Sequence, residues 1–159
     1  MLTLFLLVFL ALPQGRGPAP SVSVVSQLQC GSDRFAVLRI SNPSAHDSIF
    51  FPLSPLYTRG YTVHNMMLEV EESNRWRLVD RGSDIPPSGV RELKPGERFL
   101  DLFQLPTPQR ASTLAKRSMR LVIPYKVGTS YGQVKTKEFK ANDLPVKSDL
   151  ACPTTLNVQ

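Results

Sequence analysis

Short runs of β-branched and aromatic residues, broken at intervals of roughly 8 to 15 positions by Pro, Gly, Asn, Asp or Ser, most limit what this chain can fold into. The runs begin near residue 21, and no long amphipathic helix separates them. Parallel α/β folds need such helices between their strands, whereas antiparallel sheets do not. The pattern therefore predicts an all-β fold, and the length of 159 residues suits one compact domain.

We count about eight strand candidates, several of which alternate with the two-residue period of a half-buried strand. In residues 34–41 and 65–71 every second side chain is apolar. Trp76, the only tryptophan, lies in the run 75–80 and is predicted to fill the core. We expect an antiparallel two-sheet sandwich of about seven to eight strands, with a small barrel as the alternative.

Turn residues between the runs carry further predictions. Lys94-Pro95-Gly96-Glu97 places Pro and Gly where a type II turn prefers them. Thr107 and Pro108 are suited to the N-cap and first position of a short helix near 108–116. The last run, 133–140, has a thin apolar face and several lysines, which is typical of an edge strand.

Four segments carry a resemblance to a known class of domain. They are Arg34–Ser41 followed by Asn42-Pro43-Ser44, then Trp76-Arg77-Leu78-Val79, Leu93-Lys94-Pro95-Gly96-Glu97 and Arg120-Leu121-Val122-Ile123-Pro124-Tyr125. Their order resembles small secreted bacterial immunoglobulin-like domains, including proteinase-inhibitor-type sandwiches, over roughly residues 21 to 141. The resemblance implies an immunoglobulin-like β-sandwich over residues 20–145. A shared fold does not carry a function with it.

The N-terminus has the character of a signal peptide. Residues 2–12 are largely apolar, and small residues and prolines follow up to residue 20, although no Lys or Arg precedes the apolar stretch. We predict a leader over residues 1–19, with a buried helix or a short membrane anchor as the alternatives. No apolar run reaches the roughly 18 residues that span a bilayer, so we expect no stable membrane insertion after leader removal.

Cys30 and Cys152 are the only cysteines and lie near the two ends of the predicted mature chain. In an exported protein they suggest a disulfide that ties the tail, residues 146–159, back to the domain. Two independent thiols remain the alternative. Two distant cysteines without Cys-x-x-Cys spacing make neither a zinc site nor a redox site.

The motifs of common enzymes find little support. Gly128-Thr129-Ser130-Tyr131-Gly132 matches the nucleophile-elbow pattern, but a strand pattern and no histidine follows it. A triad of His46 or His64 with Asp101 and some serine is possible only on paper. Glu69, Glu71 and Glu72 are close in sequence, but Glu69 and Glu71, on one strand face, are best explained as a solvated surface and not as a glycosidase pair. Phosphate-loop, dinucleotide and zinc-protease motifs are absent from the sequence. We therefore predict no enzymatic activity.

We also predict neither a metal site nor a cofactor. His64, Met66 and Met67 have ligands that suit copper(I). The two methionines are consecutive, however, and side chains of consecutive residues in a strand point to opposite faces. Both therefore cannot join His64 around one ion.

The formal net charge of +6 is concentrated in the last third of the chain, where residues 105–159 hold nine Lys or Arg and three acids. Such a surface attracts anionic polymers and membrane headgroups by Coulomb steering, although a solvated edge is the plainer alternative. Aromatic residues do not alternate with the basic ones as nucleic-acid platforms require, so no nucleic-acid partner is predicted. The candidate basic face consists of Arg110, Lys116, Arg117, Arg120, Lys126, Lys135, Lys137 and Lys140.

Taken together, these features predict a secreted or periplasmic binding module without catalytic activity, whose basic face meets an unknown protein or an anionic envelope polymer. One alternative is a proteinase inhibitor acting through Ser83-Asp84-Ile85-Pro86-Pro87-Ser88. The other is a structural envelope subunit that associates through a sheet edge.

Overall fold

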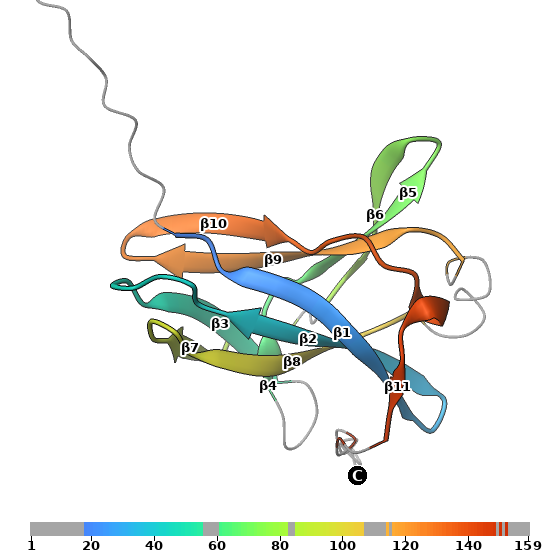
Figure 1. The fold of residues 1–159 in the computed structure, drawn as a ribbon, viewed down its shortest axis with the longest axis horizontal. Helices are drawn as coiled ribbons and strands as arrows, with labels where there is room; N and C mark the ends of the chain where they lie inside the picture. Colours follow the sequence, from blue (N-terminus) through green and yellow to red (C-terminus); the bar gives the residue numbers. More distant parts are fainter. Residues whose placement is uncertain are drawn as a thin grey trace, which may run out of the picture.

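The computed structural model describes residues 18–55, 61–82, 85–106, 114, 116–148, 150 and 152. They form eleven strand segments and one turn of 3-10 helix, η1 (Ala141–Asp143) (Figure 1). The strands are β1 (Ser21–Cys30), β2 (Asp33–Ser41), β3 (Ile49–Pro55), β4 (Tyr61–Val63), β5 (Met67–Glu72), β6 (Arg75–Arg81), β7 (Gly89–Leu93), β8 (Arg98–Gln104), β9 (Met119–Val127), β10 (Ser130–Lys135) and β11 (Val146–Lys147).

The strands make two sheets. One has four strands in the order β11-β1-β2-β8, and the other has seven, in the order β4-β3-β9-β5-β6 with β10 added to β9 and β7 added to β3. All pairings are antiparallel except that of β1 with β11. The predicted all-β two-sheet sandwich is thus confirmed, with additional short strands. β4 and β11 have three and two residues, too few to show a period in the sequence.

The main core lies between the two sheets. The predicted alternation in residues 34–41 and 65–71 is confirmed, because every second side chain there is buried in this core. Phe99 and Phe103 of β8 meet apolar residues of β3 and β9, and the ring of Phe99 packs edge-on against Phe51 at a centroid distance of 5.6 Å. The core residues at these positions are Ala36, Leu38, Ile40, Phe51, Met66, Leu68, Val70, Leu121 and Ile123.

Turn chemistry fixes the hairpins. Gly96 has φ 76°, and the Glu97 N–H donates to the Lys94 carbonyl at 3.0 Å, which confirms the predicted turn. Ser73 and Asn74 both have positive φ, 51° and 61°, as a two-residue type I′ hairpin between β5 and β6 requires.

A second, smaller core lies on the other side of β2. Phe35 and Val37 of this strand pack with Leu28, and Leu150 of the tail packs against this cluster. The predicted disulfide between Cys30 and Cys152 is present, with the two Cα atoms 5.7 Å apart. The tail therefore covers apolar side chains that β2 would otherwise present to water.

The placement of Trp76 corrects one prediction. Trp76 is half-buried and does not belong to the core. It lies opposite Glu71, beyond the last pairing of β5 with β9 at Val70, where the β5–β6 hairpin extends past the sandwich (Figure 1). Its ring cannot reach the core from there, so the prediction of a core tryptophan was wrong.

The helix expected near 108–116 falls outside the described residues except for positions 114 and 116, and the leader expected over 1–19 falls outside them except for positions 18 and 19. Both stay predictions.

Asp101 links the two sheets at their edge. This β8 carboxylate is buried and accepts hydrogen bonds of 2.9 Å from the backbone N–H groups of Val63 in β4 and of Leu102. Burial raises the pKa of Asp101 from 3.8 to about 6, although these hydrogen bonds and the charge of Arg91 act in the opposite direction. The folded protein therefore holds the Asp101 proton more tightly than the unfolded chain does.

Reducing the disulfide should destabilise the protein. We expect the free energy of unfolding to fall by about 2 to 5 kcal/mol, because the loop that the disulfide closes is long. Binding of a hydrophobic dye should also rise as the tail leaves Phe35 and Val37. Urea unfolding with and without reductant measures the first effect. A variant carrying both Cys30→Ala and Cys152→Ala should match the reduced protein and ignore reductant, and a wild type indifferent to reductant would contradict the expectation.

Asp101 should also make stability depend on pH. Because its pKa is raised on folding, its contribution is complete below about pH 4 and is lost as the pH rises through about 6, a change of up to about 3 kcal/mol. Asp101→Asn should flatten the unfolding free energy over this interval relative to wild type, as measured by urea titrations at several pH values. The exposed Asp143→Asn is the control and should leave the wild-type pH profile unchanged. Parallel profiles for wild type and Asp101→Asn would refute the assignment.

Candidate binding face

The β9–β10 hairpin presents two chemically different faces. Leu121, Ile123 and Val134 point into the main core. The alternate residues of the two strands, Arg120 and Lys126 in β9 and Tyr131, Gln133 and Lys135 in β10, point the other way, onto the outer face of the seven-stranded sheet. We call these five residues the outer hairpin face.

Glycines at two positions explain the Gly-x-Ser-x-Gly pattern of this hairpin. Gly128 has φ 54° and opens the two-residue turn between Val127 and Ser130. Gly132 lies opposite Tyr125, and a Cβ atom at this position would be 2.6 Å from the Tyr125 ring. Ser130 begins an exposed strand after an antiparallel turn, which differs from the strand-to-helix turn of a nucleophile elbow.

The structure divides the predicted basic residues into two groups. Arg117 pairs with Glu72, and Arg120 pairs with Glu69 through Nε and Oε2 at 2.6 Å. Lys135 lies 3.8 Å from the same Glu69 carboxylate, with half of its side chain exposed. Arg110 lies outside the described residues. Of the predicted basic residues that the structure describes, four lysines have no carboxylate partner: Lys116, Lys126, Lys137 and Lys140.

Arg120 is an anchor of the outer face. Its guanidinium lies 4.0 Å from the centre of the Trp76 ring while its Nε–H donates to Glu69. The side chains of Arg120 and Glu69 are only 19% and 21% exposed. Arg120 therefore joins three strands, and its charge is already compensated. The sequence pattern predicts Trp76 in the core. The residue that covers its ring, Arg120, lies 44 positions further along the chain, so no local pattern could indicate this contact.

Lys126 makes a looser contact with an aromatic ring. Its Nζ lies 5.4 Å from the centre of the Tyr131 ring, and Tyr131 is 82% exposed. An aromatic side chain this exposed, beside an ammonium group, offers both apolar area and positive charge to a partner.

Lys137 follows Thr136, whose buried hydroxyl accepts a hydrogen bond from the Leu121 N–H. Lys137 is exposed and lies beyond the end of β10 at Lys135.

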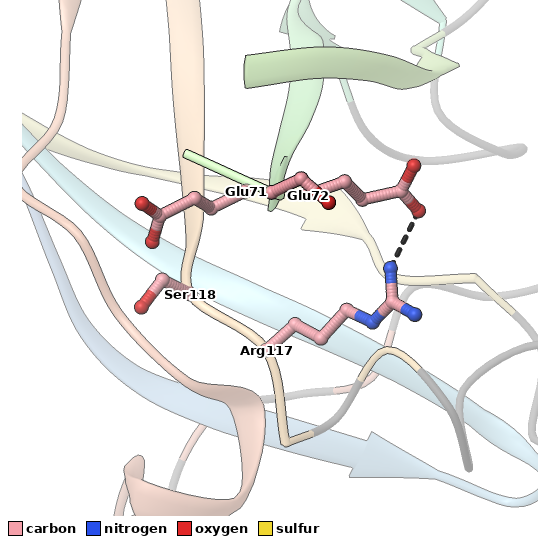
Figure 2. Close-up of a pocket in the computed structure, with 5 residues that line it drawn as sticks. Glu71, Glu72, Arg117 and Ser118 are labelled. Atoms are coloured by element: carbon pink, nitrogen blue, oxygen red, sulfur yellow. Dashed lines mark hydrogen bonds and ion pairs between the residues drawn. The ribbon is translucent and has the colours of Figure 1, made fainter. Parts of the chain in front are cut away.

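An open polar pocket of about 460 Å³ lies where the β5–β6 turn meets the segment before β9 (Figure 2). Its lining consists of Glu71, Glu72, Ser73, Arg117 and Ser118. Figure 2 shows Arg117 directed to Glu72, while the Glu71 carboxylate points away from that pair. Glu72 also pairs with Arg77 at 3.3 Å. The pocket is thus walled by an ion-pair network that holds the hairpin.

The residues weighed for a catalytic triad do not adopt one. Ser54 is fully buried, donates to the Ile85 carbonyl at 2.8 Å, and therefore accepts from His64 Nδ1 at 2.7 Å. Both oxygens of Asp101 accept from backbone N–H groups and not from His64. A buried serine whose hydrogen is donated to a carbonyl is a structural link between β3 and the neighbouring loops.

Part of the segment considered as an inhibitory loop is described. Ile85 is 52% exposed, and Ser88 donates its N–H to the Leu53 carbonyl at 2.9 Å. Ser83 and Asp84 lie outside the described residues.

Comparisons with protein-family models, with curated proteins and with solved structures found no match for this chain. Within the described part of the chain, no helix is long and apolar enough to cross a membrane. Among these residues there is also no group of three or more His, Cys, Asp or Glu side chains arranged to hold a metal ion.

Removing the Arg120 side chain should expose Trp76. Because Trp76 is the only tryptophan, its fluorescence reports this site alone. Arg120→Ala should shift the emission to longer wavelength, increase quenching by acrylamide, and lower stability by about 1 to 2 kcal/mol through the lost cation–π contact and ion pair. Arg75→Ala, an exposed change on the same hairpin, is the control and should alter neither signal. Unchanged quenching in Arg120→Ala would show that the guanidinium does not shield the ring.

Proposed function

We propose that this protein is a secreted or periplasmic binding module without catalytic activity, and that it binds an anionic protein or envelope polymer. The binding surface consists of Lys126, Lys135 and Lys137 with the exposed ring of Tyr131. The observation that carries the proposal is that Lys126 lies beside an 82% exposed tyrosine, with its Nζ 5.4 Å from the centre of the Tyr131 ring, and that neither Lys126 nor Lys137 has a carboxylate partner in the described ranges.

The two groups of basic residues have different roles in this proposal. Arg117 and Arg120 hold the β5–β6 hairpin against β9 through Glu72 and Glu69, so binding an anion would cost them existing ion pairs. Lys126 and Lys137 have no such cost. Lys135 shares Glu69 with Arg120 at a longer distance, so it can turn to a stronger anionic partner.

The disulfide and the apolar N-terminus support the proposed location. Disulfides persist in oxidising compartments, which include the periplasm and the extracellular space. The formal net charge of +6 adds long-range attraction for anionic partners there, and this attraction weakens as salt screens it.

Charge reversal on this surface should weaken binding to polyanions. A variant with Lys126, Lys135 and Lys137 changed to Glu should bind heparin and polyglutamate at least tenfold more weakly than wild type, and wild-type binding should decline with salt. A control with Arg39, Lys94 and Arg98 changed to Glu has the same net charge, but its changes lie in or beside the four-stranded sheet. Titration calorimetry across a salt series measures both.

The comparison of the two variants shows whether binding depends on the proposed surface or only on the total charge. If the control loses as much affinity as the first variant, binding follows total charge and the proposed surface is wrong. If wild type binds neither polymer at low salt, the anionic partner is refuted.

A further inference from the structure

The outer edge of β10, which faces away from β9, pairs with no other strand among the residues that the structure describes. Val127 and Ser130 flank the two-residue turn and form the first hydrogen-bonded pair of the hairpin. Such pairs recur at every second residue in an antiparallel ladder. The bond from the Thr136 N–H to the Leu121 carbonyl, 2.9 Å long, continues the same phase.

The backbone groups of β10 are therefore divided between its two sides. Those of Ser130, Gly132 and Val134 face β9, and those of Tyr131, Gln133 and Lys135 face away from it. In the described part of the chain β10 pairs with β9 alone. Figure 1 shows the start of β1, in the other sheet, near β10, but no register joins the two strands. A further strand could add to this edge.

The charge of a strand determines whether it can pair with the outer edge of β10. Lys135 and Lys137 lie at the end of the edge, and Lys126 lies beside Tyr131 on the neighbouring strand. A second copy of β10 would bring like charges together, and directly opposed like charges destabilise strand pairs. An acidic strand would instead place carboxylates beside the same lysines, where opposite charges on neighbouring strands attract.

We propose that the outer edge of β10 binds an extended acidic segment of a partner protein by strand addition. The segment takes hydrogen bonds from the backbone of Tyr131, Gln133 and Lys135, and its acidic side chains meet the lysines on the outer hairpin face. This inference rests on the proposed function and names both the partner chemistry and the mode of binding.

The test uses two peptides of equal charge and the full chain with its disulfide. The first is a ten-residue capped peptide of alternating valine and glutamate. The second has the same sequence with alternate backbone nitrogens methylated on the pairing edge, so it keeps its carboxylates but cannot complete the ladder. We expect the first to bind at least tenfold more tightly. Amide exchange at Tyr131, Gln133 and Lys135 should slow on binding, whereas Gly132 and Val134 should be protected already.

A variant gives an independent measurement. Gln133→Pro removes an N–H that points away from β9, so the hairpin ladder keeps its bonds. We expect this variant to lose at least tenfold in peptide affinity while its affinity for heparin stays within twofold of wild type. Gln133→Ala is the matched control and should bind the peptide as wild type does. If Gln133→Pro does not fold, the comparison of the methylated and unmethylated peptides still tests strand addition.

The outcomes separate this inference from the proposed function. Equal binding of both peptides would overturn strand addition and leave the anionic partner standing. The same holds if heparin binds and neither peptide does. Failure of heparin, polyglutamate and both peptides to bind would overturn both proposals.

Discussion

The burial of β2 on both of its faces is the constraint on which much of this structure depends. Its inward side chains fill the space between the sheets, while Phe35 and Val37 face the other way and are also buried. A strand at the surface of a two-layer sandwich has only one covered face. Something must therefore cover the second, and Leu150, held near by the Cys30–Cys152 disulfide, lies on it. The parallel pairing of β11 with β1 brings the chain to that point, with the Pro145 carbonyl accepting from the Gln27 N–H at 2.9 Å.

The sequence was informative wherever a local rule decides the outcome. Alternation placed Leu68 in the core, and Gly96 marked its turn, because strand period and positive φ are properties of a few adjacent residues. Pro124 follows a local rule as well. It lies in β9 between the residues that pair with β5 and the residue that pairs with β3, where no neighbouring strand requires a hydrogen bond from its nitrogen. The short strands β4 and β11 could not be predicted, because three and two residues are too few to show a period, and the partner of β11 is β1, at the other end of the domain sequence.

The candidate site was predictable in composition but not in arrangement. The excess of basic residues after position 105 is visible in the sequence. Which of them are compensated depends on Glu69 and Glu72, whose partners Arg120 and Arg117 lie 51 and 45 positions away. Trp76 was misplaced for the same reason, since whether a tryptophan faces the core or a guanidinium is decided by strand order. The pattern of a single sequence carries no information on strand order. It therefore could not show which basic residues of this segment form ion pairs and which do not.

Lysines at the β10 edge can be explained as protection against unwanted strand pairing, and that explanation is compatible with a binding role. The repulsion is electrostatic, so it acts on strands of like charge and not on acidic ones. The backbone groups of Tyr131, Gln133 and Lys135 face away from β9, and no strand of the described chain pairs with them. An acidic strand would gain the ion pairs that a second copy would lose, and each such cross-strand pair differs by up to about 1 kcal/mol from a neutral one. Lys135 in β10, Lys137 beyond its end and Lys126 on the neighbouring strand would therefore discriminate between partners by charge, while the hydrogen-bonding ladder remains the same for all of them. Selectivity of this kind needs no pocket, and it suits the outer hairpin face, where Tyr131, Gln133 and Lys135 are exposed beside the half-buried Lys126.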